Sequence, residues 1–488
     1  MSTTTTILPL FLLLPLLNGA AAGDICIVGS GISGSSTAFF LTNYTTALSG
    51  SGQLRVFERR AKVGGRLATV TLAGDQFEAG GSIIHPRNLH VRRFADLLGL
   101  AAKTGGDDDW LGIWDGRRFV FQTLRPLQPG TSWLRRKLHS FLNSLRLLNR
   151  YGLSLLNMDR FVQVMLQRFM LYYNDFDSRP VFHTVDDMLK WSGLFNLTRR
   201  TLGEELLDAG LNSRTISELV TVITRINYGQ SASISGLAGA VSLAGSESGL
   251  WAVKGGNWQL AAGLLKAANA TLHLQEGIDS IDYAGDHYVL KSNKGHEYNC
   301  EATVVATPLD EVNITFSPPI SIPPRKTQHT HATFVRGLLN PKFFGLTSVS
   351  DIPKLIGTME LPEIPFSSMA ILKKYSEQDM AYKVFSRVKL NDSLLDQIFS
   401  ARKETIRINW PAYPHYEAPE VFAPIILDGK HLYYVNTFES AASAMETGAV
   451  AAENVARLLI ARLPLPSRPE AEAALLLPPD DQDQRADL

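Results

Sequence analysis

The sequence predicts an α/β protein in which a Rossmann-type domain is joined to a second, α+β domain. Three observations predict this. A β-branched run, Ile25–Val28, leads directly into a Gly-x-Gly-x-x-Gly turn that a helical stretch follows. A second strand over 53–57 ends on the acidic Glu58. The pattern then becomes helical from Trp133 to about Phe176, and residues 312–400 mix strands with helices, which favours a separate α+β domain.

Length and charge restrict the number of domains and the classes of partner that the sequence predicts. With 488 residues the chain can form more than one domain, and 47 acidic residues balance 47 basic ones, so no global field favours nucleic acid. We assign segments 24–104, 252–311 and 401–463 to the Rossmann-type domain. The second domain takes segments 105–251 and 312–400.

Each glycine of the turn has a physical role. Gly29 permits the tight turn, Gly31 lets a pyrophosphate approach the backbone, and Gly34 lets the helix pack on the sheet. The helix N-terminus then meets the phosphates, and Glu58 stands where an acidic side chain binds the ribose hydroxyls. The alternative is an ordinary glycine-rich turn with an unrelated carboxylate. The pattern predicts a bound dinucleotide.

Two further glycine pairs indicate a large cofactor. Gly64-Gly65-Arg66 and Gly80-Gly81-Ser82 follow soon after the ribose acid, and such pairs let backbone press close to a ligand. Arg66 is available to an anionic phosphate.

The N-terminus resembles a secretory leader. Residues 7–17 are apolar but too few to span a bilayer as a helix, and small residues follow at 20–23. We therefore predict a signal peptide over 1–23, although its start lacks Lys and Arg, and a retained anchor is the alternative. Five glycosylation sequons agree with a lumenal protein: Asn43, Asn196, Asn269, Asn313 and Asn391.

The chain has two cysteines, Cys26 and Cys300. Cys26 lies inside the first strand, so we expect a buried free thiol rather than a disulfide.

Other segments predict particular elements. Residues 111–120 indicate a hairpin with Asp-Gly as its turn, and 105–109 a turn. The aromatic and Met-rich stretch Met165–Tyr173 is either the wall of a lipophilic channel or simply core. Residues 464–488, rich in proline and aspartate, predict a disordered tail.

These motifs together resemble the FAD-binding half of the flavin amine oxidase and phytoene desaturase superfamily. Within it the chain resembles the prenylcysteine oxidase family, called farnesylcysteine lyase in plants. The resemblance covers roughly residues 24–460, and its more specific marks are residues 82–85 with Asn88, 225–230 and 253–257.

The resemblance implies a glutathione-reductase-like or amine-oxidase-like FAD domain beside a substrate domain. It implies oxidation of the thioether of a prenylated cysteine to an aldehyde, free cysteine and hydrogen peroxide, with O2 as acceptor. The expected partner is a lipophilic small molecule and not nucleic acid; peripheral membrane association and the oligomeric state are left open. The expected FAD-binding residues are Gly29, Ser30, Gly31, Ser33, Gly34, Glu58, Arg59, Gly65, Arg66, Gly81, Ser82, Ile278, Thr307, Glu439, Glu446 and Thr447.

For catalysis we single out His85, which follows Gly81 where polyamine oxidases also place a histidine, and Tyr228 and Asn227 as secondary candidates. The alternative for His85 is a loop histidine satisfied by backbone. No metal site is expected. The leader and the family together imply the lumen of a lysosome or vacuole, or the cell exterior. A secreted amine or polyamine oxidase and a non-catalytic FAD-binding protein are the competing interpretations.

Overall fold

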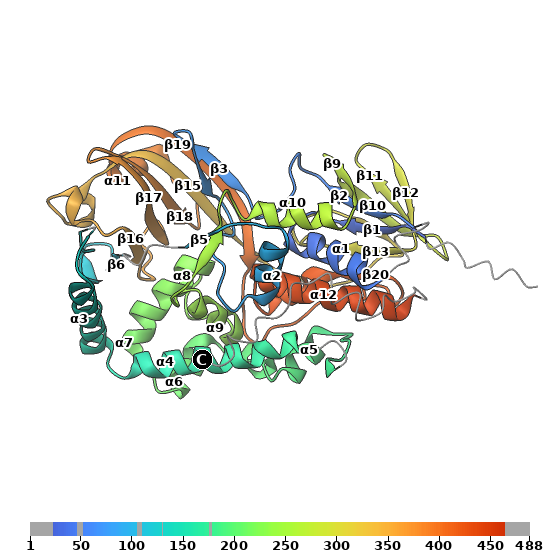
Figure 1. Ribbon diagram of the computed structural model, residues 1–488, viewed down its shortest axis with the longest axis horizontal. Helices are drawn as coiled ribbons and strands as arrows, with labels where there is room; N and C mark the ends of the chain where they lie inside the picture. Colours follow the sequence, from blue (N-terminus) through green and yellow to red (C-terminus); the bar gives the residue numbers. More distant parts are fainter. Residues whose placement is uncertain (1–22, 46–51, 105–109, 129, 175–177, 464–488) are drawn as a thin grey trace, which may run out of the picture.

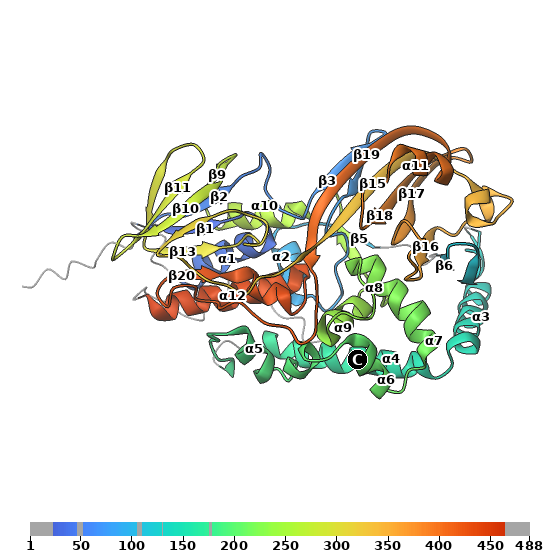
Figure 2. The same ribbon diagram turned by 180° about the vertical axis from the view of Figure 1, so that it is seen from behind.

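The computed structural model describes residues 23–45, 52–104, 110–128, 130–174 and 178–463. The predicted leader, except Gly23, the turn at 105–109 and the tail 464–488 lie outside these residues. Figure 1 shows two sheet-bearing halves side by side, with a layer of helices below them, and Figure 2 shows the same arrangement from behind.

The first half is built on a five-stranded parallel sheet that confirms the predicted Rossmann-type domain. β1 (Ile25–Val28) lies at its centre, between β2 (Leu54–Glu58) and β13 (Ala302–Val305). β9 (Thr271–Leu274) and β20 (Leu432–Tyr434) form its edges, in the order β20-β13-β1-β2-β9. All four β1 residues are buried, as a strand covered on both faces requires.

Alternate residues of β1 face different layers. Ile25 and Ile27 pack with α1 (Ile32–Tyr44), α10 (Trp258–Ala267) and α12 (Met445–Arg462). Cys26 and Val28 pack against the other face, where a four-stranded sheet covers them. That sheet has the order β12 (Glu297–Cys300), β11 (Tyr288–Ser292), β10 (Ile278–Tyr283) and β14 (Thr315–Ser317).

The two cysteines form a disulfide, so the prediction of a free thiol is wrong. Cys26 and Cys300 are bonded with a Cα–Cα distance of 5.8 Å. Cys300 ends β12, two residues before Ala302 pairs with Ile25 of β1. The chain therefore brings Cys300 of the covering sheet over the face of β1 to which Cys26 points.

Asn43 is not a usable glycosylation site in this fold. It lies in α1 and is 4% exposed, with both polar side-chain atoms buried and without a hydrogen-bond partner. A glycan there would prevent α1 from packing on its neighbours. Asn196, Asn269, Asn313 and Asn391 are all exposed.

The second half contains a seven-stranded, mostly antiparallel sheet. Its central strands are β15 (Thr327–Leu339), β18 (Asp379–Ser386) and β17 (Ser368–Ser376). β19 (Phe399–Pro414) pairs with β15 along its length, so the predicted boundary at residue 401 falls inside a strand of this sheet. The order continues through β16 (Leu355–Thr358) to β6 (Leu111–Trp114) and β7 (Phe119–Gln122), the predicted hairpin.

The helical region forms the lower layer in Figure 1. Its first part is two helices rather than one, α3 (Trp133–Tyr151) and α4 (Ser154–Phe169), because Gly152 takes a positive φ of 62° between them. None of the helices in the described parts of the chain is long and apolar enough to cross a membrane. The remaining helices of this layer are α5 (Val185–Trp191), α6 (Leu202–Asp208), α7 (Ser213–Thr215), α8 (Thr221–Tyr228) and α9 (Gly236–Ala244).

Two short helices pack on these layers. α2 (Leu89–Leu97) packs against α12 and α10, and α11 (Asp392–Ile398) packs on β19. Two small antiparallel strand pairs complete the fold: β3 (Thr69–Leu72) with β4 (Asp75–Glu78), and β5 (Ala102–Thr104) with β8 (Trp251–Val253).

Candidate active site

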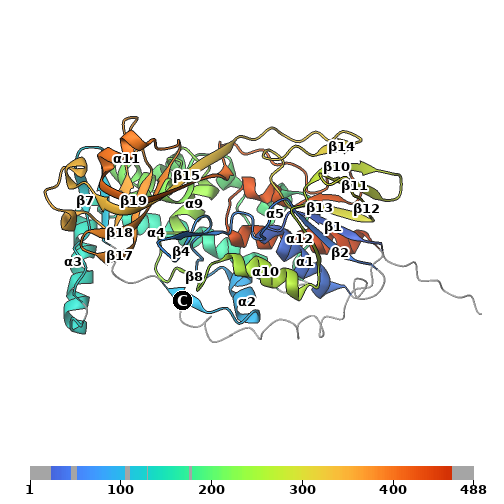
Figure 3. The same cartoon turned by 90° about the horizontal axis from the view of Figure 1, so that it is seen from above.

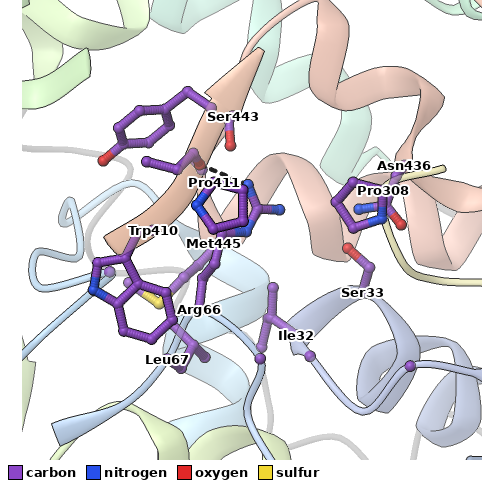
Figure 4. A pocket seen from close by; sticks show the side chains of 18 of the residues that line it. Ile32, Ser33, Arg66, Leu67, Pro308, Trp410, Pro411, Asn436, Ser443 and Met445 are labelled. Atoms are coloured by element: carbon purple, nitrogen blue, oxygen red, sulfur yellow. Dashed lines mark hydrogen bonds between the residues drawn. The ribbon is translucent and has the colours of Figure 1, made fainter. Parts of the chain in front are cut away.

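A cavity of about 500 Å³ lies where the two halves and the helical layer meet. Its walls come from the glycine turn, the segments 64–67 and 80–83, and the strand β19. Figure 4 shows Ser33, Pro308 and Asn436 on one side, Leu67 and Trp410 on the other, and Arg66 between the two groups. The site therefore joins the Rossmann-type unit to the second domain.

The turn after β1 has the geometry that the sequence predicts. Gly29 takes a positive φ of 114°, and a Cβ on Gly34 would lie 2.0 Å from the Gly29 carbonyl oxygen, so only glycine permits this packing. A Cβ on Gly31 would meet no other protein atom closer than 3.9 Å. The protein therefore leaves an open space beside Gly31. A ligand that lies close to the backbone there explains why no side chain fills this space.

Glu58 is held against this turn. Its carboxylate accepts hydrogen bonds from the Ser30 hydroxyl at 2.5 Å, the Ser30 backbone N–H at 3.3 Å and the Arg60 N–H at 2.9 Å. Glu58 is 6% exposed and lines the cavity. A fixed carboxylate at the end of β2 is placed to accept hydrogen bonds from ribose hydroxyls.

Two helix N-termini meet at the cavity. Residues 31–33, at the start of α1, and residues 444–447, at the start of α12, both line it. Free N–H groups and the positive ends of the helix dipoles favour an anionic ligand there.

Three buried polar atoms of the cavity lining have no partner in the protein. They are the Asn436 side-chain oxygen, the Thr330 hydroxyl and the Trp410 indole nitrogen. Buried polar groups normally find a hydrogen-bond partner, so a polar ligand in the cavity accounts for all three. These atoms, the space at Gly31 and the fixed Glu58 fit a bound FAD.

Most of the predicted FAD-binding residues line the cavity, including Arg59, Gly65, Gly81, Ser82, Ile278 and Thr307. Gly34 stands behind the turn as a packing residue. Three of the candidates, Glu439, Glu446 and Thr447, bond to other residues of the protein. Glu446 accepts hydrogen bonds from the N–H groups of His90 and Val91 at the start of α2, and Thr447 bonds to the backbone of Ala444. Both reach the cavity as part of the α12 N-terminus.

Arg66 forms an ion pair with Glu439 and also donates to the Ala412 carbonyl oxygen. Burial alone would raise the pKa of Glu439, but Arg66 and Arg325 outweigh it and lower the pKa to about 2. Glu439 is therefore ionised, and it fixes the Arg66 side chain at the cavity wall.

His85 lines the cavity as predicted, and its ring is held on both sides. Its Nε2 lies 3.0 Å from a carboxylate oxygen of Glu247, and its Nδ1 accepts a hydrogen bond from the Arg87 N–H at 3.1 Å. The other Glu247 oxygen accepts from the Gln163 amide at 2.9 Å. Glu247 is 162 residues from His85 and stands in no motif, so it could not be predicted from the sequence.

Tyr228 and Asn227, at the end of α8, also line the cavity. The Tyr228 hydroxyl donates to the Ser443 carbonyl oxygen at 2.9 Å, and the Asn227 amide donates to the Ser242 carbonyl oxygen at 2.8 Å. Burial raises the pKa of Tyr228 above its ordinary value, so the phenol stays neutral. The rings of Tyr413 and Tyr416 pack against Tyr228.

Part of the cavity wall is apolar. Met165, Leu166 and Phe169 of α4 are buried and line the cavity, so this stretch is both core and cavity wall. The described residues contain no group of three or more His, Cys, Asp or Glu side chains that could hold a metal ion.

The chain matches known proteins along most of its length. A family model described as prenylcysteine lyase matches residues 134–468, and one described as an NAD(P)-binding Rossmann-like domain matches residues 27–98. The chain is 58% identical over 444 residues to farnesylcysteine lyase of Arabidopsis thaliana, covering 90% of this chain and 88% of that one. It is 34% identical over 471 residues to prenylcysteine oxidase 1 of Homo sapiens, covering 90% and 89%.

Solved structures share the fold. Cyclohexylamine oxidase from Brevibacterium oxydans superposes with a TM-score of 0.59 at 17% identity, covering 90% of this chain and 98% of that one. Putrescine oxidase bound to putrescine gives a TM-score of 0.58 at 13% identity, covering 90% and 99%. At these identities the likeness concerns the fold alone.

Proposed function

Because the chain belongs to the prenylcysteine lyase family, we propose that it is an FAD-dependent oxidase that cleaves the thioether of farnesylcysteine. The thioether, O2 and water give the prenyl aldehyde, free cysteine and hydrogen peroxide, which balances in atoms and electrons. The observation that carries this proposal is one cavity with a dinucleotide cradle at one wall and the apolar side chains of α4 at another.

The substrate makes the chemistry accessible without a strong base. The carbon beside sulfur loses a hydride because the cation that develops is allylic and sulfur-stabilised. Bound FAD supplies the hydride acceptor and passes the electrons to O2. Water adds to the carbon, and the resulting hemithioacetal collapses to aldehyde and thiol.

The protein's first task is to hold an isoprenoid chain away from water. Met165, Leu166 and Phe169 offer it an apolar surface, and burial of the chain contributes about 0.8 kcal/mol per methylene-sized group. A dry cavity also keeps bulk water away from the reacting carbon while the hydride leaves.

The second task is to accept the proton that water releases when it adds. His85 and Glu247 form a hydrogen-bonded pair at the cavity, and imidazole and carboxylate can share a proton. Tyr228 and Asn227 cannot accept one near neutral pH, so we assign them to binding the amino-acid end of the substrate.

The amine oxidase alternative is not favoured. Its support is structural likeness at 17% identity or less, whereas the relatives at 58% and 34% identity are named for prenylcysteine or farnesylcysteine. The retained cradle and the His85–Glu247 pair argue against a non-catalytic FAD-binding protein.

We also propose a lumenal location in a lysosome or vacuole, or outside the cell, with peripheral attachment to a membrane. The disulfide between Cys26 and Cys300 and the exposed sequons at Asn196, Asn269 and Asn391 support an oxidising, glycosylating compartment.

Product analysis tests the proposed reaction. Purified FAD-loaded protein is incubated in air with farnesylcysteine, and aldehyde, cysteine and peroxide are quantified. We expect the three products in equal amounts without added nicotinamide. Dependence on NAD(P) or on a quinone, or oxidation of short alkyl amines as readily as of farnesylcysteine, would overturn the proposal.

A further inference from the structure

Helix α3 (Trp133–Tyr151) is attached to the rest of the molecule through its polar side. The His139 ring lies 2.8 Å from the Arg125 carbonyl oxygen, the Asn143 side-chain oxygen accepts from the Leu124 N–H at 2.6 Å, and Arg150 pairs with Glu218 at 2.7 Å. Leu147 completes this face, and Tyr151 at the end of the helix is buried.

The opposite side of α3 is apolar and faces solvent. A helix turns about 100° per residue, so the spacing of its leucines and phenylalanine places them in one stripe opposite the anchoring face. Amphipathic helices of soluble proteins normally turn such a stripe toward the core, and here the orientation is reversed. The stripe consists of Leu134, Leu138, Phe141, Leu142, Leu145 and Leu148, which are 41–64% exposed.

The charges of α3 have one sign. Residues 133–151 include five Arg and Lys residues and no Asp or Glu. Helical geometry places Arg135 and Arg146 along one border of the stripe and Lys137 along the other. The Lys137 ammonium lies 5.1 Å from the ring of Trp133, which is 67% exposed at the start of the helix.

We propose that α3 docks the protein on an anionic phospholipid surface, with the apolar stripe in the headgroup–acyl boundary and the flanking cations on lipid phosphates. Basic residues beside an apolar face, with an aromatic residue at one end, are typical of helices that lie in the membrane interface. A second copy of the chain is a poorer occupant, because two α3 helices facing each other would oppose cations with cations.

The position of α3 links membrane docking to substrate access, a link that rests on the proposed function. Figure 3 shows α3 projecting at the end of the molecule beyond the seven-stranded sheet. Leu153 and Leu156, at the turn into α4, are 70% and 59% exposed. Met165 of the cavity wall lies nine residues after Leu156 on the same helix, roughly 14 Å along its axis. A lipophilic substrate in the bilayer would thus lie near the apolar wall.

Vesicle co-sedimentation of the FAD-loaded protein tests the proposal. We expect wild type to bind phosphatidylcholine vesicles that contain phosphatidylserine, with weaker binding in high salt and little on phosphatidylcholine alone. The double substitution Leu138→Glu and Phe141→Glu should weaken binding at least about tenfold. The matched control, Val388→Glu with Val421→Glu, changes two equally exposed apolar residues elsewhere and should bind as wild type.

Two outcomes would overturn the proposal. One is equal vesicle binding by wild type and the α3 variant. The other is a wild-type dimer, seen by analytical ultracentrifugation, that the α3 substitutions dissociate without any vesicle binding. Failure of the proposed function is separate. If the protein binds vesicles through α3 but oxidises neither free nor vesicle-bound farnesylcysteine, the proposal of membrane docking is kept and the proposed reaction is wrong.

Discussion

At the scale of single residues, Glu58 gives a prediction about cofactor binding. Its carboxylate holds Ser30 and Arg60 in place and faces the cavity. Glu58→Ala should weaken FAD retention about 10- to 100-fold, because a hydrogen bond to a charged group contributes about 1.5–3 kcal/mol. Flavin content after gel filtration measures the loss. Glu297→Ala, at an exposed residue of β12, is the control, and equal flavin in both variants would refute this role.

The His85–Glu247 pair yields a kinetic prediction. Glu247→Gln keeps the size of the side chain but removes the carboxylate charge beside Nε2 of the His85 ring. We expect kcat to fall about 100-fold, as for loss of a general acid–base group, with KM and flavin content nearly unchanged. Gln163→Leu, which removes only the amide that bonds Glu247, should have a smaller effect. Unaltered kcat in Glu247→Gln would mean that the pair is purely structural.

Glu420 gives a prediction about pH and stability. Burial raises the pKa of this carboxyl to about 8. Because the folded pKa lies above the unfolded one, ionisation favours the unfolded chain, and stability is lost as pH rises between about 4.5 and 8, by about 1.4 kcal/mol per pH unit. Glu420→Gln stays neutral, so its Tm should match that of wild type at pH 5 and exceed it at pH 7.5. The same Tm difference at both pH values would contradict the assignment.

At the scale of elements, α4 should select the length of the prenyl chain. Met165 is buried at the cavity, while the neighbouring Val164 is 40% exposed. Met165→Glu should abolish farnesylcysteine turnover but leave flavin content intact, and Val164→Glu should behave as wild type. In wild type, replacing the farnesyl group by dimethylallyl should raise KM by orders of magnitude, because each lost methylene removes about 0.8 kcal/mol. A KM independent of chain length would place the prenyl group elsewhere.

Elements with local signals could be predicted from the sequence, and long-range partners could not. The strand–turn–helix from Ile25 to Tyr44 and the hairpin of β6 and β7 carry their own glycine and alternation patterns, and both are confirmed. The disulfide was missed because Cys26 and Cys300 are 274 residues apart, and only the stacking of two sheets brings them together. The predicted domain boundary at residue 401 divides β19, because the sequence of this strand does not show that it pairs with β15.

The same limit applies to the site at the scale of the whole molecule. The glycine turn, Glu58 and His85 were found because short motifs contain them. Glu247, Thr330 and Trp410 come from separate segments that meet only in the folded chain. The cavity is therefore a product of the packing of two domains, and residues of both line it.

Oxidation of farnesylcysteine by the flavin within this cavity can be observed by anaerobic mixing of the FAD-loaded protein with farnesylcysteine, followed by the flavin absorbance. We expect one equivalent of farnesylcysteine to bleach the oxidised flavin and putrescine to leave it unchanged. When air is admitted, the oxidised spectrum should recover and peroxide should form. Reduction of the flavin by putrescine but not by farnesylcysteine would contradict the proposed reaction.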